Sequence, residues 1–260
     1  MSSLDLSLAL TGFLIGFLTN SLGGGGGGLF VGILTSFFNI PGAVAVSSSL
    51  ATVLPTTIAG SWSHWRNGNV RLALGLPMAA GGVGGAVAGS LLSSKIPPSL
   101  YKPMFAVLFL YMTVEMIRKY FKKEKPAAPD APVQSSDRWK GVAYGVFGGV
   151  LSGVLGISGT PPILIGLMVL GCSVIQMIGT SVFVLAAISA AGFLAHLHLG
   201  DVRWSLVLPL ASGSILGGLS APWVISRVKR ETLEAVYRPI VMVLTIAVTA
   251  VMIFKLIRGN

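Results

Sequence analysis

Long apolar stretches separated by short polar ones dominate the chain. Asp, Glu, Lys and Arg are all missing from residues 6–65, 72–94, 141–200 and 205–226. Because a helix needs about 20 apolar residues to cross a bilayer core, several of these stretches are long enough for more than one crossing. The strict alternation of a membrane barrel is missing, and an isolated strand cannot satisfy its backbone in lipid. The pattern predicts an all-α polytopic membrane protein.

Ten apolar segments are predicted as helices, five in each half of the chain. They are 6–22, 29–40, 43–64, 70–92 and 100–120, then 142–155, 162–170, 174–198, 202–225 and 235–256. The first two of each half are short: segment 29–40 spans roughly 18 Å against a core of about 30 Å. A single broken span over 6–40 would be roughly 50 Å long and would overshoot the core. Segment length therefore favours a helical hairpin whose turn is glycine-rich.

The chain contains an internal repeat. Residues 49–85 align without a gap on 181–217, and the motif "HWRNGNVR" recurs as "HLHLGDVR". A shared apolar composition does not produce a repeated H-x-x-x-G-[ND]-V-R, so we predict a duplication. The predicted units are a first membrane repeat (1–123), a Pro/Ala/Ser-rich cytoplasmic linker (124–140) and a second membrane repeat (141–260).

The number of crossings in each repeat sets the topology. A hairpin plus three transmembrane helices turns the second copy upside down, which predicts two inverted repeats, whereas a broken span plus three helices would leave the copies parallel. Most of the 18 Lys and Arg residues fall on the linker side in either arrangement. The positive-inside rule assigns that side to the cytoplasm of an inner (plasma) membrane.

Composition supports the membrane assignment. Only 10% of the residues are charged and 53% are hydrophobic, against roughly 25% charged in soluble domains. The net charge of +10 does not indicate a nucleic-acid partner, because the basic residues lie between apolar runs. The single cysteine, Cys172, excludes an internal disulfide and a cysteine-based metal cluster. We expect membrane lipid as a partner, no cofactor and no metal; a homo-oligomer is compatible with the sequence.

Two glycine-rich breaks are the main candidates for chemistry. Six consecutive glycines occupy 23–28, and "SGVLGISGTPP" at 152–162 is the counterpart at a shift of 133. Glycine is about 1 kcal/mol less favourable than alanine in a helix, and non-helical backbone persists in lipid only where protein buries it or where it lines a cavity. Each break precedes a short helix, whose free N–H groups and dipole would favour an anion. In an inverted pair the two breaks would meet near the midplane, where secondary transporters bind substrate.

Several other polar and glycine residues have structural explanations as well as functional ones. Glycines also allow close helix packing, the favoured interpretation for Gly81, Gly85 and Gly89. Serine and threonine in helices can bond their own backbone, and the two histidines that end the third helices can be hydrogen-bonded interfacial residues instead of gates. The predicted substrate-binding residues are Asn20, Gly24, Gly25, Gly26, Gly27, Gly28, Ser48, Ser49, Thr52, Ser158, Gly159, Thr160, Thr180 and Ser181; the predicted gating or vestibule residues are His64, Arg71, His196 and Arg203.

The glycine-rich first segment, the repeated "HWRNGNVR" and "HLHLGDVR", the P-x-x-x-G helices that follow and the basic linker together resemble the sulfite exporter TauE/SafE family, or TSUP permeases. The likeness covers nearly the whole chain. It departs from the usual first loop, G-I-G-G-G, and at Ser158, Thr160 and Pro161. The resemblance implies a non-enzymatic secondary permease or exporter for small sulfur-containing or organic anions such as sulfite or sulfonates.

Alternating access around a midplane anion site is the mechanism that the inverted repeats favour. An anion channel is the alternative. A haem-binding redox subunit using His64, His196 or His198 is a third hypothesis from a different class, disfavoured because the histidines would lie near opposite surfaces. Transport direction, coupling ion and oligomeric state are left open by the sequence.

Overall fold

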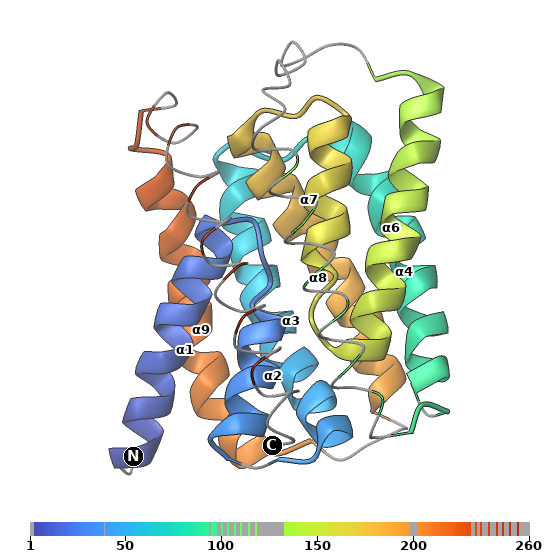
Figure 1. Cartoon of the computed structure of the whole chain (residues 1–260). Helices are drawn as coiled ribbons and strands as arrows, with labels where there is room; N and C mark the ends of the chain where they lie inside the picture. The colour runs from blue at the N-terminus through green and yellow to red at the C-terminus, as the bar shows by residue number, and fades with distance from the viewer. Residues whose placement is uncertain are drawn as a thin grey trace.

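The computed structural model describes residues 3–38, 40–93, 95–97, 133–197 and 202–229, with single positions between 100 and 118 and between 232 and 254. The described ranges are helical and contain no strand (Figure 1). The helices are α1 (Ser3–Ser21), α2 (Gly27–Ser36), α3 (Gly42–Arg66), α4 (Leu72–Ser93), α6 (Ser135–Leu155), α7 (Thr160–Val169), α8 (Val174–His196) and α9 (Trp204–Ile225). The predicted segments 100–120 and 235–256, most of the linker and His198 lie outside the described residues.

Five of these helices are long and apolar enough to cross a membrane: α1, α3, α4, α8 and α9. Helices α2 and α7 have 10 residues each, so they are as short as the sequence predicts. Helix α6 is longer than expected and begins seven residues before the predicted start at Val142. The reason is local: the Asp137 carboxylate accepts a hydrogen bond from the Gln134 N–H at 3.2 Å and lies 3.4 Å from Lys140. Residues 135–140 of the predicted linker therefore belong to a helix.

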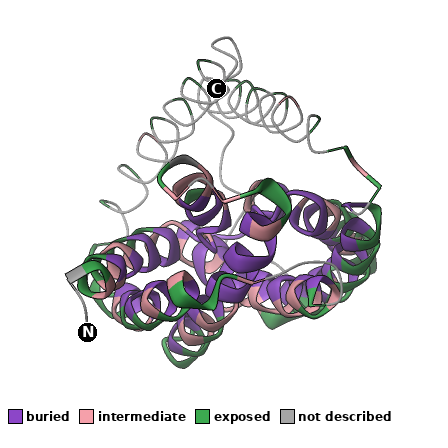
Figure 2. Cartoon of the chain, turned by 90° about the horizontal axis from the view of Figure 1, so that it is seen from below, coloured by how far each residue is buried: buried purple, intermediate pink, exposed green. Residues whose placement is uncertain are grey.

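The outer surface of the bundle is apolar. Figure 2 shows the buried residues on the faces that the helices turn toward one another, with exposed residues on the outside. Large apolar side chains such as Leu6, Leu194 and Leu208 are each more than 60% exposed. A soluble protein rarely exposes so many, so this surface is suited to lipid.

Glycines hold two helix pairs in close contact. On α4, a Cβ added to Gly81, Gly85 or Gly89 would overlap the backbone carbonyls of Val142, Val146 or Val150 on α6. The predicted packing role of these three glycines is confirmed. On α9, Gly213 and Gly217 meet the carbonyls of residues 9 and 13 on α1 in the same way.

The two halves exchange equivalent contacts. Helix α1 packs on α9 and α6 packs on α4, while α3 contacts both α8 and α9, and α8 contacts both α3 and α4. In Figure 1, α1 rises from the N-terminus and α2 descends, whereas α6 descends and α7 rises. The chain thus turns back at each glycine break.

Candidate functional site

Each glycine break contains left-handed backbone at matched positions. In the first, Gly23 and Gly26 have φ of 74° and 81°. At a shift of 133, Gly156 and Gly159 have φ of 66° and 62°. L-residues avoid this region, whereas glycine adopts it without steric penalty. Two of the six consecutive glycines are therefore needed for the turn itself.

The two breaks touch each other. The Gly25 N–H donates to the Thr160 hydroxyl over a long distance of 3.4 Å, and the Ser158 and Thr160 hydroxyls are 3.1 Å apart. A Cβ added to Gly27 would lie 2.9 Å from the Ser158 nitrogen. Backbone from the two halves thus converges, as predicted from the sequence.

Two serines bind the breaks from the long helices behind them. Ser49 on α3 donates to the carbonyl of Gly27, at 3.0 Å, and lies 3.2 Å from that of Gly156 in the other half. Its counterpart on α8, Ser181, donates to the carbonyl of Gly23. Gly23 and Gly156 are themselves counterparts, so each half binds the break of the other. These two glycines are not among the predicted site residues, although their match at a shift of 133 in the sequence could have indicated them.

The helices after the breaks begin without side-chain caps. Gly26 precedes α2 and Gly159 precedes α7, and neither position supplies a capping hydrogen bond. The first N–H groups of α2 therefore point, with the positive end of the helix dipole, at the place where the breaks meet. In α7, Pro161 and Pro162 carry no N–H, so α7 offers the N–H and the hydroxyl of Thr160, and the Ser158 hydroxyl lies in the break just before it.

Three more of the predicted hydroxyls have bonding partners within the protein. Ser48 accepts a hydrogen bond from the Arg203 N–H at 3.0 Å, and Thr180 accepts one from the Arg71 N–H at 2.8 Å. Thr52 bonds the carbonyl of Ser48 within α3. Ser48 and Thr180 thereby join each long helix to the start of a helix in the other half, and the two arginines lie at those helix starts.

The predicted gating histidines end their helices as expected but face inward. His64 is fully buried, with Nε2 3.2 Å from the Asn20 carbonyl and Nδ1 3.3 Å from the Asn69 side chain. His196 is 4% exposed, with Nε2 2.8 Å from the Gly153 carbonyl. Each ring binds the end of the helix that precedes a glycine break, which indicates that the histidines position the breaks.

Asn20 lies beside the breaks, between α1, α3 and α9. Its amide nitrogen donates to the Gly16 carbonyl at 2.8 Å, and its amide is next to Gly60 and Gly218. The side-chain oxygen of Asn20 is buried and has no hydrogen-bond partner among the described residues. A buried polar atom without a partner is uncommon and often indicates bound water or a ligand.

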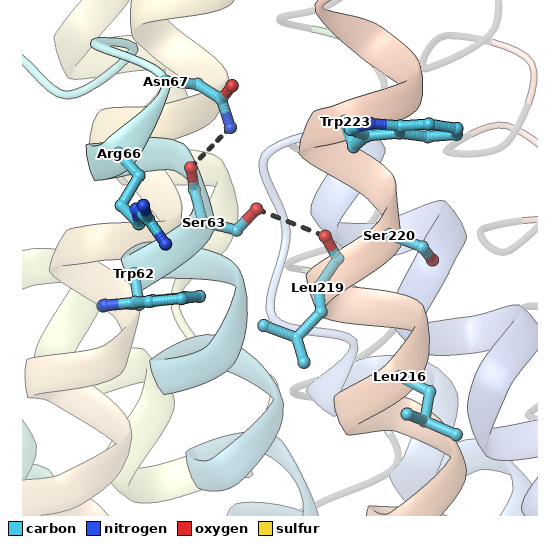
Figure 3. Close-up of a pocket in the computed structure, with 8 residues that line it drawn as sticks. All are labelled: Trp62, Ser63, Arg66, Asn67, Leu216, Leu219, Ser220 and Trp223. Carbon is cyan, nitrogen blue, oxygen red and sulfur yellow. Dashed lines mark hydrogen bonds between the residues drawn. The ribbon is translucent and has the colours of Figure 1, made fainter.

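The convergence point is closed in this conformation. Gly25, Gly26, Gly27, Ser158 and Gly159 are all buried, and Gly24, Gly28 and Thr160 are partly buried. A cavity of about 550 Å³ lies elsewhere, between the C-terminal parts of α3 and α9 (Figure 3). The described residues contain no group of three His, Cys, Asp or Glu side chains able to hold a metal ion.

Comparisons with known proteins agree with the membrane architecture. The profile of a family described as Sulfite exporter TauE/SafE matches residues 8–252. The chain belongs to the TauE/SafE family. It is 32% identical to the probable membrane transporter protein YdhB of Bacillus subtilis (strain 168), over 81% of this chain and 86% of that protein.

Two further B. subtilis relatives carry the same description. The probable membrane transporter protein YtnM is 29% identical over 84% of this chain and 74% of its own length, and YunE is 22% identical over 91% and 94%. No solved structure matches this TauE/SafE chain. The chain is a multi-pass membrane protein of a transporter family.

Proposed function

We propose that this protein is a secondary permease for small sulfur-containing or organic anions, such as sulfite or sulfonates, and that the two halves are inverted repeats that work by alternating access in the inner membrane. The membership of the TauE/SafE family supports transport. The opposite directions of α1 and α6, and the reciprocal contacts between the halves, support the inversion.

One observation supports an anion as the substrate. Two uncapped helix N-termini, one from each half, meet at buried backbone that includes no acidic side chain. Backbone N–H groups and hydroxyls can replace the hydration shell of an anion without a fixed positive charge, which would hold the anion too tightly for release. The closed convergence point fits an occluded state of a transporter.

The basic end of the molecule is proposed to be cytoplasmic. Arg66, Arg138, Lys140 and Arg227 all lie at the end where α3 and α9 finish and α6 begins. The positive-inside rule favours this end for the cytoplasm.

Flux measurements in proteoliposomes test the proposal. The purified protein is reconstituted, and uptake of sulfite, thiosulfate, sulfoacetate and small carboxylates is compared with uptake into protein-free vesicles of the same lipid. We expect saturable flux of at least one sulfur-containing anion, with competition by its congeners. Equal permeation with and without the protein across the whole panel would contradict the transport function. Non-saturable flux at channel rates would replace alternating access by a channel.

A further inference from the structure

One face of α3 carries hydroxyl side chains at positions where its counterpart α8 carries aliphatic ones, and two of these hydroxyls bond across the interface between α3 and α9. The residues on this face of α3 are Ser49, Thr52, Thr56, Gly60 and Ser63; at a shift of 132, α8 carries Ser181, Val184, Ile188, Gly192 and Ala195. The spacing of three or four residues places each set on one helix face. The two copies therefore differ in the polarity of this face.

The contacts across the α3–α9 and α4–α8 interfaces also differ in polarity. The Thr56 and Ser214 hydroxyls bond each other across α3 and α9, and Ser63 donates to the Leu219 carbonyl at 3.2 Å. In the other half, Ile188 fills the space beside Gly82. Val184 and Ile188 belong there to a buried apolar cluster with Met78 and Ala86.

A cavity opens at one end of the polar interface. Figure 3 shows its lining residues, Trp62, Ser63 and Arg66 on α3, Asn67 just after α3, and Leu216, Leu219, Ser220 and Trp223 on α9, with Ser63 and Leu219 pointing toward each other. The Arg66 guanidinium carbon lies 5.0 Å from the centre of the Trp62 ring, and that of Arg227 lies 3.4 Å from the centre of the Trp223 ring. Positive charge at the mouth of a cleft raises the local concentration of anions.

The buried end of the interface holds a polar atom without a partner. The Asn20 side-chain oxygen lies beside Gly60, one helical turn from the Thr56 and Ser214 pair, and makes no described hydrogen bond. Water that enters the interface would satisfy this oxygen, and the paired hydroxyls would exchange one partner for another at little loss. Separation of the α4–α8 interface would instead expose aliphatic side chains to water, which is unfavourable in proportion to the exposed area.

We propose that water and the transported anion reach the glycine breaks from the basic end along the α3–α9 interface, and that the equivalent α4–α8 interface opens less readily. This inference rests on the proposed transport function for the identity of the solute. The path runs from the cavity past Ser63, Asn20 and Thr56 to Ser49, which binds both breaks.

Paired cysteine variants test the path. In a Cys172→Ser background, which removes the only native thiol, Thr56→Cys is compared with its counterpart Ile188→Cys. Both positions are 0% exposed in the closed conformation, so static burial predicts equal protection. Each protein is reconstituted and treated with an anionic methanethiosulfonate reagent, and the modified fraction is followed by intact mass.

We expect modification of Thr56→Cys to be about tenfold faster than that of Ile188→Cys, which corresponds to about 1.4 kcal/mol between the two opening equilibria. Equal rates, or faster modification of Ile188→Cys, would overturn the path. Modification needs no transport, so the two proposals fail separately. Preferential modification of Thr56→Cys in a protein without anion flux would overturn the transport function and keep the hydrated path, while flux without that preference would overturn the path alone.

Discussion

At the scale of single residues, the six consecutive glycines are not equivalent. Gly23 and Gly26 supply left-handed backbone, while Gly27 begins α2 in contact with the backbone of residues 156–158. A Cβ at Gly24 would meet only ordinary contacts, at 3.5 Å or more. The sequence predicts that the run is special, but it cannot assign these separate roles because the partner backbone lies some 130 residues away.

Alanine at Gly27 is expected to abolish anion flux, because its Cβ would push apart the two breaks. Gly32→Ala on the same helix is the matched control, since nothing lies within 4 Å of its added Cβ and alanine is favoured over glycine in a helix by about 1 kcal/mol. Flux in proteoliposomes, normalised to reconstituted protein, is the measurement. Equal flux for Gly27→Ala and the native protein would show that the breaks do not need to touch.

At the scale of helices, pairing depends on glycine contacts. Helices α4 and α6 approach so closely that Gly85 has no room for a side chain, whereas the adjacent Gly84 faces away with nothing within 4 Å. The small-residue spacing on α4 is visible in the sequence and correctly predicts close packing. The identity of the partner helix is not visible, because it depends on how the halves are arranged.

Valine at Gly85 is therefore expected to separate α4 from α6 and to lower the midpoint of thermal unfolding in detergent by several degrees, an overpacking effect of about 1–3 kcal/mol. Valine at Gly84 adds the same side chain on the outer face and should leave the midpoint within about one degree. A fluorescence-detected size-exclusion melt measures both. Equal midpoints of thermal unfolding for the two variants would contradict this interpretation.

At the scale of the whole molecule, apolar pattern, repeat and short segments predict an all-helical membrane protein with paired breaks. The start of α6 was misjudged because the charged first turn at residues 135–140 looks like part of the linker, although Asp137 stabilises a helix start. The inward orientation of His64 and His196 could not be predicted either, since their acceptors are backbone carbonyls of another helix. Periodicity reveals elements, whereas contacts between distant backbones require coordinates.

An inverted arrangement places the starts of α4 and α9 on opposite sides of the membrane, and a parallel one places them on the same side. In the Cys172→Ser background, Asn67→Cys and Ser205→Cys, both at exposed positions, are treated in intact cells with a membrane-impermeant maleimide. We expect labelling of Ser205→Cys from outside and of Asn67→Cys only after permeabilisation. Labelling of both from one side would exclude the inverted repeat.

The pairing of α1 with α9 bears on how the protein is made. Helix α1 leaves the ribosome before α9, yet the surface that accepts Gly12 and Gly16 belongs to α9, about 200 residues later. Until α9 is inserted, the face of α1 that carries Gly12 and Gly16 contacts lipid or the insertion machinery instead. A truncated chain that ends in the linker would lack α9, so Gly12 and Gly16 on α1 would have no backbone to pack against there.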